Sequence, residues 1–65
     1  MKKTFETIFG NVTVRNAMFD VDGTTLEEGI ELKEEDGELH ELFGYRNIDE
    51  LTIKEVEKII SLIKN

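Results

Sequence analysis

The period of the hydrophobic pattern changes once along this chain, and that change limits the folds that the chain can adopt. From Thr4 to about Tyr45, apolar residues alternate with polar ones, which is typical of half-buried strands. From Thr52 onward they recur every three or four residues, as on one face of a helix. Strands followed by a single amphipathic helix predict an α+β fold in which the helix covers one face of the sheet.

Turn signals divide the strand region into four segments. Gly10-Asn11 and Asp22-Gly23 both favour the tight turns of two-residue hairpins. The stretch "EEDG", residues 34–37, forms a third turn of four residues. We therefore predict a four-stranded antiparallel β-meander with one C-terminal α-helix packed on one face.

The predicted turns decide which residues face each other across the hairpins. A two-residue turn at 22–23 places Phe19 opposite Leu26, and a four-residue turn at 34–37 places Leu32 opposite Leu39. Both pairings bring large apolar side chains together, as expected for neighbouring strands.

The second strand has an irregular apolar pattern. Its apolar residues lie at even positions up to Val14 and at odd positions from Ala17 onward. An extra residue in the strand would account for that change, so we predict a β-bulge near Arg15-Asn16. Gly29 in the third strand indicates a bend or a second bulge.

The C-terminal helix carries its own start signal. Thr52 and Glu55 have the spacing of a capping box, in which each side chain binds the backbone amide of the other residue. The apolar stripe that should pack on the sheet consists of Ile53, Val56, Ile60 and Ile63, with Ile59 beside it.

Length and composition indicate the size of the domain and its cellular location. Residues 1–65 are expected to form a single small acidic domain, too short for a deep catalytic cleft with a separate cap. There is no cysteine, and no apolar segment follows the basic start at Lys2-Lys3. Both features favour a reducing cytoplasmic location over an exported or membrane-bound one.

Negative charge is concentrated in one part of the chain. Residues 20–50 contain twelve carboxylates and two basic residues, a net charge of −10, whereas the rest of the chain carries +3. The centre of this segment is the second predicted hairpin. Its candidate partner-binding residues are Glu27, Glu28, Glu31, Glu34, Glu35, Asp36 and Glu38.

An acidic ribbon of this kind predicts a non-enzymatic binding or inhibitor protein with a basic protein partner. Carboxylates along a ribbon can imitate a nucleic-acid backbone and occupy a basic groove, as a phage or mobile-element modulator of a nucleic-acid-handling protein could do. The same charge disfavours direct binding to nucleic acid or to an anionic membrane. The alternative is a solvated face that keeps the protein soluble and protects a strand edge.

A second hypothesis is a structural or homo-oligomerising module, which leaves monomer and homodimer open. One helix covers one face of a four-stranded sheet, so the other face could bury against a second copy. The residues proposed for that contact are Ile8, Phe9, Leu42 and Tyr45.

A remote alternative comes from "FDVDGTTL", residues 19–26. This string resembles the nucleophile motif of haloacid dehalogenase-type enzymes. The resemblance implies Asp20 as the phosphoryl-accepting nucleophile, Asp22 as the general acid/base and Mg²⁺ beside them, on a parallel sheet. It covers about eight residues, and the family's later Ser/Thr, Lys and acidic motifs are missing, so no catalytic residue and no cofactor are assigned.

No metal ligand is assigned either. Asp20, Asp22, Thr24 and Glu31 fall at EF-hand spacing, but Gly23 stands at the fourth position of that loop and not the sixth. His40, the only histidine, is expected at the surface without a role.

Overall fold

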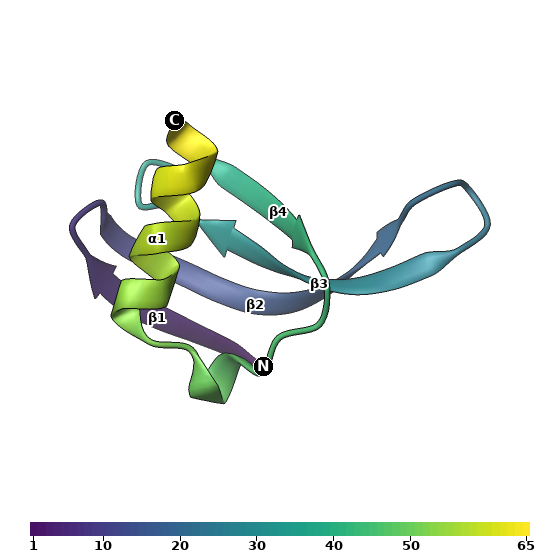
Figure 1. Ribbon diagram of the computed structural model, residues 1–65, viewed down its shortest axis with the longest axis horizontal. Coiled ribbons are helices and arrows are strands. Elements are labelled where there is room, and N and C mark those ends of the chain that lie inside the picture. Colours follow the sequence, from purple (N-terminus) through teal and green to yellow (C-terminus); the bar gives the residue numbers. More distant parts are fainter.

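The computed structural model describes residues 1–65, and it contains four strands followed by helical structure (Figure 1). The elements are β1 (Lys2–Thr7), β2 (Gly10–Asp20), β3 (Leu26–Lys33), β4 (Leu39–Phe43), a single 3-10 turn (Ile48–Glu50) and α1 (Ile53–Lys64). The strands lie side by side in the order β1-β2-β3-β4, and every neighbouring pair is antiparallel. The predicted α+β meander with one C-terminal helix is confirmed.

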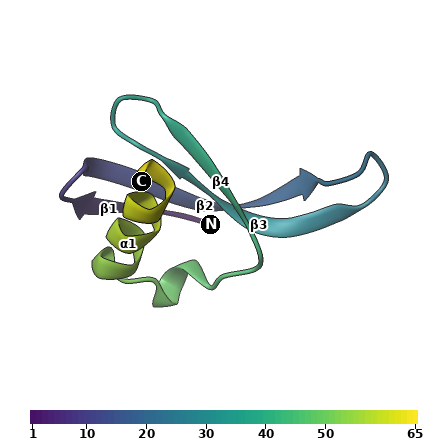
Figure 2. The same cartoon turned by 45° about the horizontal axis from the view of Figure 1, so that its top comes forward.

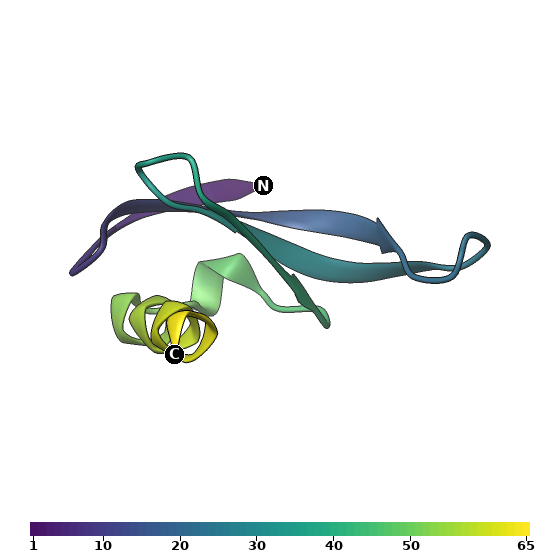
Figure 3. The same cartoon turned by 90° about the horizontal axis from the view of Figure 1, so that it is seen from above.

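The core lies between one face of the sheet and α1 (Figure 3). Alternation along β2 and β3 directs their even-numbered residues towards the helix, where Val56 and Ile60 are fully buried. The predicted capping box is present, since Thr52 Oγ1 accepts from the Glu55 amide and Glu55 Oε1 accepts from the Thr52 amide. The buried core consists of Phe5, Val12, Val14, Ile30, Leu32, Ile48, Leu51, Val56 and Ile60.

The predicted bulge near Arg15-Asn16 is wrong. The β2–β3 ladder runs without interruption from Thr13 opposite Lys33 to Asp20 opposite Leu26. The apolar residues of β2 shift from even to odd positions because the sheet also buries an apolar residue on the face away from α1.

That second-face residue is Phe19, which packs beside the Phe43 ring with the ring centroids 5.2 Å apart. Phe19 lies over Gly29, where an added Cβ would come within 2.6 Å of the Phe19 ring. Gly29 therefore makes room for an aromatic side chain, and the ladder passes through it without the bend or second bulge that we predicted.

The pairing registers of the β2–β3 and β3–β4 hairpins differ by one residue from the predicted ones. In the β2–β3 hairpin Asp20 pairs with Leu26, so Phe19 faces Glu27. The Val21 amide donates to the Thr25 carbonyl, and the loop between them has three residues. Asp20 Oδ1 accepts from the Gly23 amide (2.6 Å), and this side-chain bond favours a wider loop than Asp22-Gly23 alone predicts.

The other two hairpins also turn differently from the prediction. In the β3–β4 hairpin Leu32 faces His40, because the Glu34 amide donates to the Glu38 carbonyl and the loop between them has three residues. In the β1–β2 hairpin Thr7 pairs with Gly10, so the turn is Ile8-Phe9 and Gly10 already belongs to β2.

β2 and β3 are longer than the outer strands and continue beyond them as a two-stranded ribbon. β1 stops pairing at Arg15, and β4 stops pairing at Gly29. The remaining segment, Asn16–Glu28, is called the arm. It projects away from α1 and the core, as Figures 1 and 2 show at the right of each view.

Candidate interaction surface

The seven acidic residues predicted to bind a partner do not form one surface. Glu27 and Glu28 lie on the arm, whereas Glu31 lies in the middle of β3. The other four lie in or beside the β3–β4 turn, at the opposite end of the sheet from the tip of the arm (Figure 1). The extended strand between them separates the two groups, although they are close in sequence.

Glu31 is engaged within the sheet. Its Oε1 accepts from Arg15 Nε at 2.6 Å on the face of the sheet away from α1. The same row continues with Glu41 directly opposite Glu31 on β4. Arg15 therefore neutralises the negative charge of Glu31, one of the residues predicted to bind a partner.

Glu34 is buried below the C-terminal end of α1. Its Oε2 lies 2.6 Å from His40 Nε2, and its Oε1 lies 3.1 Å from Lys64 Nζ. These three groups connect the β3–β4 hairpin to the last turn of the helix. The hydrogen bond with His40 is the main cause that lowers the pKa of Glu34, and Lys64 acts in the same direction.

The prediction that His40 is a surface residue is wrong, because only 9% of it is exposed. The three-residue loop of the β3–β4 hairpin places His40 opposite Leu32, on the face towards α1. An ionised carboxylate only accepts hydrogen bonds, so His40 Nε2 carries the proton that is donated to Glu34.

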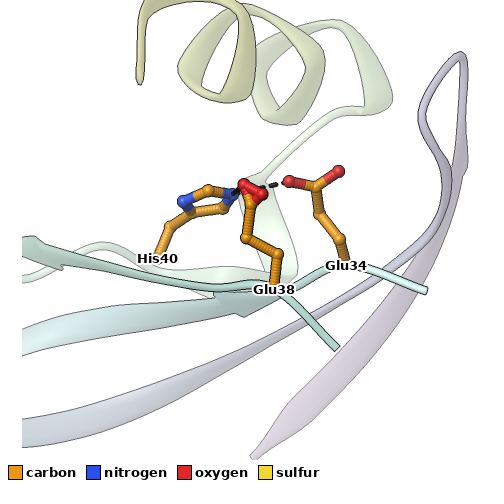
Figure 4. Close-up of side chains that lie close together, drawn as sticks. All are labelled: Glu34, Glu38 and His40. Carbon is orange, nitrogen blue, oxygen red and sulfur yellow. Dashed lines mark hydrogen bonds and ion pairs between the residues drawn. The ribbon is translucent and has the colours of Figure 1, made fainter. Parts of the chain in front are cut away.

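Glu34, Glu38 and His40 also form the chain's one cluster with the residue types of a metal site (Figure 4). One potential ligand atom from each lies within 4.8 Å of the others. A divalent ion there would have to break the Glu34–His40 hydrogen bond and lie near the Lys64 ammonium group. We therefore interpret the cluster as a structural connection between the hairpin and the helix.

The remaining turn residues also serve the local structure. Glu35 Oε2 accepts from the Asn11 amide at 3.1 Å and fastens the β3–β4 turn to the neighbouring hairpin. Asp36 Oδ1 accepts from the Glu38 amide at 2.9 Å. The carboxylates of Asp36 and Glu38 remain exposed at this end of the sheet.

The arm carries the second acidic group, in which all four carboxylates are exposed: Asp20, Asp22, Glu27 and Glu28. Two of them shape the loop, since Asp20 binds the Gly23 amide and Asp22 binds the amides of Thr24 and Thr25. The bonds from these two threonine amides lower the pKa of Asp22, which keeps it ionised. Glu27 and Glu28 make no side-chain hydrogen bond or ion pair.

The enzyme resemblance involves these same loop residues. Asp20 and Asp22 lie at the end of β2 and in the exposed loop that follows it. Both carboxylates accept backbone hydrogen bonds of that loop, which gives each of them a structural role. The sheet is antiparallel, whereas the resemblance implies a parallel one.

The apolar residues predicted for a homodimer contact are also dispersed. Phe9 and Leu42 pack against the core, whereas Ile8 is exposed in the β1–β2 turn and Tyr45 is exposed after β4. On the arm, sequence reasoning did not single out Met18, and it predicted that Leu26 packs opposite Phe19, whereas Phe19 faces Glu27. Met18 and Leu26 are 54% and 62% exposed. The only sequence signal for the arm was the length of the second strand pattern, which indicated that β2 extends further than β1.

A groove lies beside the start of α1. It has a volume of about 470 Å³ and is lined by charges of both signs, among them Arg46, Lys58 and Glu55. Of these, Glu55 already serves the helix cap, where its carboxylate accepts from the Thr52 amide. The longest helix, α1, has 12 residues and is too short to cross a membrane. Comparison of the chain with family models, curated proteins and solved structures found no match.

Proposed function

We propose that this chain is a non-enzymatic acidic binding protein that engages a basic protein partner through its arm. The observation that supports the proposal is the charge of residues 20–28, which contain four carboxylates and no basic residue. The ribbon that carries them stands away from the helix and the core (Figure 2). Its charges are thus accessible to a partner.

The shape of the arm favours a grooved partner. The molecule measures 37 × 25 × 18 Å, and its longest axis includes the arm. A narrow acidic ribbon enters a groove more readily than a flat surface would, and a groove lined by Lys and Arg attracts it electrostatically. Nucleic-acid-handling proteins have such grooves, and occupying one would block the nucleic acid. We therefore favour an inhibitor that imitates nucleic acid.

The test compares three double variants with the wild-type chain, using a protein captured from the native host on the immobilised chain. The arm variant is Glu27→Gln/Glu28→Gln, and the turn variant is Asp36→Asn/Glu38→Gln. The control, Glu6→Gln/Glu50→Gln, removes two exposed charges elsewhere and so has the same net charge. Dissociation constants are measured from about 50 mM to about 500 mM salt, because screening weakens attraction between exposed charges.

We expect the arm variant to bind about tenfold more weakly at low salt, and the control to bind nearly as the wild type does. The difference should shrink as salt is added. Binding that is equal for the arm variant and the wild type, or that does not change with salt, would overturn the proposal. A loss confined to the turn variant would move the binding surface to the opposite end of the sheet and contradict the role of the arm.

A further inference from the structure

A small groove lies at the base of the arm, on the side of the sheet that faces α1. It has a volume of about 320 Å³ and is lined by Asn16, Ala17, Met18, Glu28 and Tyr45. The helix does not reach this part of the sheet (Figure 3). The groove is therefore open to solvent, and Tyr45, at 66% exposed, forms one of its walls.

A cross-strand pair also lines the groove. Met18 on β2 lies directly opposite Glu28 on β3, so the Met18 thioether chain and the Glu28 carboxylate project on the same face. Glu28 has no hydrogen-bond or ion-pair partner for its side chain. The lining of the groove thus combines an apolar side chain, a free carboxylate and an aromatic residue.

The backbone on both sides of Tyr45 is anchored to the arm. The Gly44 amide donates to the Glu28 carbonyl at 3.0 Å, and Asn16 Nδ2 donates to the Arg46 carbonyl at 3.2 Å. These two bonds keep the residue between them at the groove before any ligand arrives. Such preorganisation reduces the entropy lost on binding.

We infer that this groove is a socket for an arginine or lysine side chain of a basic protein partner. Met18 and the Tyr45 ring would pack against the aliphatic stem, the ring face would attract the cation, and Glu28 would pair with the charged end. The inference rests on the proposed function and specifies the chemical group of the partner that the arm recognises. Arg46 is not among the residues that line the socket; it lines the groove beside the start of α1.

A second copy of this chain is a poor occupant of the socket. The arm carries four carboxylates and no basic residue between Asp20 and Glu28, so two arms would repel each other. Charge complementarity instead selects a basic segment of a different protein.

Two neighbouring glutamates allow a sharp test. Glu27 and Glu28 are adjacent and exposed, but they lie on opposite faces of the ribbon, and only Glu28 lines the groove. The variants Glu27→Gln and Glu28→Gln change the net charge equally. A contact in the socket depends on Glu28 alone, whereas general attraction depends on both.

The probe is an acetylated and amidated tri-arginine peptide, with the tri-citrulline peptide as its uncharged match. Binding is followed by the fluorescence of Tyr45, the only tyrosine in a chain without tryptophan, and by backbone amide chemical shifts. We expect a response to tri-arginine only, with shifts centred on residues 16–18, 28 and 45. Glu28→Gln should weaken binding about fivefold and Glu27→Gln much less. Tyr45→Phe should retain binding in the shift assay, and Tyr45→Ala should weaken it.

Equal weakening by Glu27→Gln and Glu28→Gln would overturn the socket and leave the electrostatic role of the arm standing. Shifts centred on the β3–β4 turn would also overturn it. Failure of the proposed function has a different signature, namely a captured partner that the arm double variant binds as tightly as the wild type does.

Discussion

Because Gly29 has no side chain, the face of the sheet away from α1 has room for the Phe19 ring. The Phe19 ring lies on the face away from α1, where no other element covers it, and it is nevertheless nearly buried. It reaches that state by lying over Gly29 and against Phe43. Phe19 is diagonal to Gly29 across the two strands, a distance that a long aromatic side chain can span.

We predict that Gly29→Ala destabilises the protein by about 1–3 kcal/mol, because the new methyl group collides with the Phe19 ring and the Leu42 carbonyl. Urea unfolding measures the change. Ala17→Gly, directly opposite in the ladder, serves as the matched control for exchanging Ala and Gly in this strand pair. An unfolding midpoint for Gly29→Ala at or above that of the wild type would contradict the steric explanation.

At the scale of elements, the sequence predicted which segments form strands and helix, but not how the strands pair. Periodicity and the capping box depend on local contacts, so the meander and the start of α1 could be predicted from nearby residues. Register depends on turn geometry, and at Asp20 the decisive contact is a side-chain bond to the Gly23 amide. One residue of register reverses the face of every following side chain.

The same one-residue shift explains what was missed at the candidate site. With a four-residue turn, His40 would not face Leu32, and nothing in the sequence pointed to its contact with Glu34. The acidic character of residues 20–50 could be predicted from composition. Its division into the arm and the β3–β4 turn was not, because that division depends on where β1 and β4 stop pairing.

The Glu34–His40–Lys64 contacts connect β3, β4 and α1, and they should make stability depend on pH. The folded-state pKa of Glu34 is below its ordinary value of 4.5, so the unfolded chain binds this proton more readily. The stabilisation by Glu34 is therefore present above that ordinary value. It is lost as the pH falls through the folded-state pKa.

We predict that the free energy of unfolding of Glu34→Gln lies below that of the wild type near neutral pH, and that the gap narrows in acid. Protonated Glu34 resembles glutamine in charge, which is the reason for the convergence. Urea unfolding of both proteins across a pH series measures the gap, with Glu35→Gln as a control beside it in the turn. A gap that stays constant or widens towards low pH would refute this role of Glu34.

At the scale of the whole molecule, the chain consists of a covered body and an uncovered ribbon. The body has α1 and the 3-10 turn on one face of the sheet, whereas the arm has neither neighbouring strands nor a helix. A two-stranded ribbon by itself is marginally stable in water, so the arm depends on its attachment to the body.

Hydrogen exchange should therefore divide the β2–β3 ladder into two parts. We predict that hydrogen-bonded amides of residues 16–20 and 26–28 exchange faster than those of residues 12–14 and 30–32, because the arm can open without unfolding the core. Amide exchange followed by NMR measures both groups in one sample. Equal protection along the ladder would mean that arm and body unfold as one unit.

The division between body and arm also separates folding from recognition in the amino-acid sequence. Between Asp20 and Glu28 every residue is exposed, so this stretch contributes no buried side chain to the fold. Apart from Asp20 and Gly23, which shape the loop, its positions can accumulate substitutions while the body stays intact, and surface changes of this kind usually have small effects on stability. The tip of the arm is consequently the natural place to graft or select new sequences when a different partner is wanted.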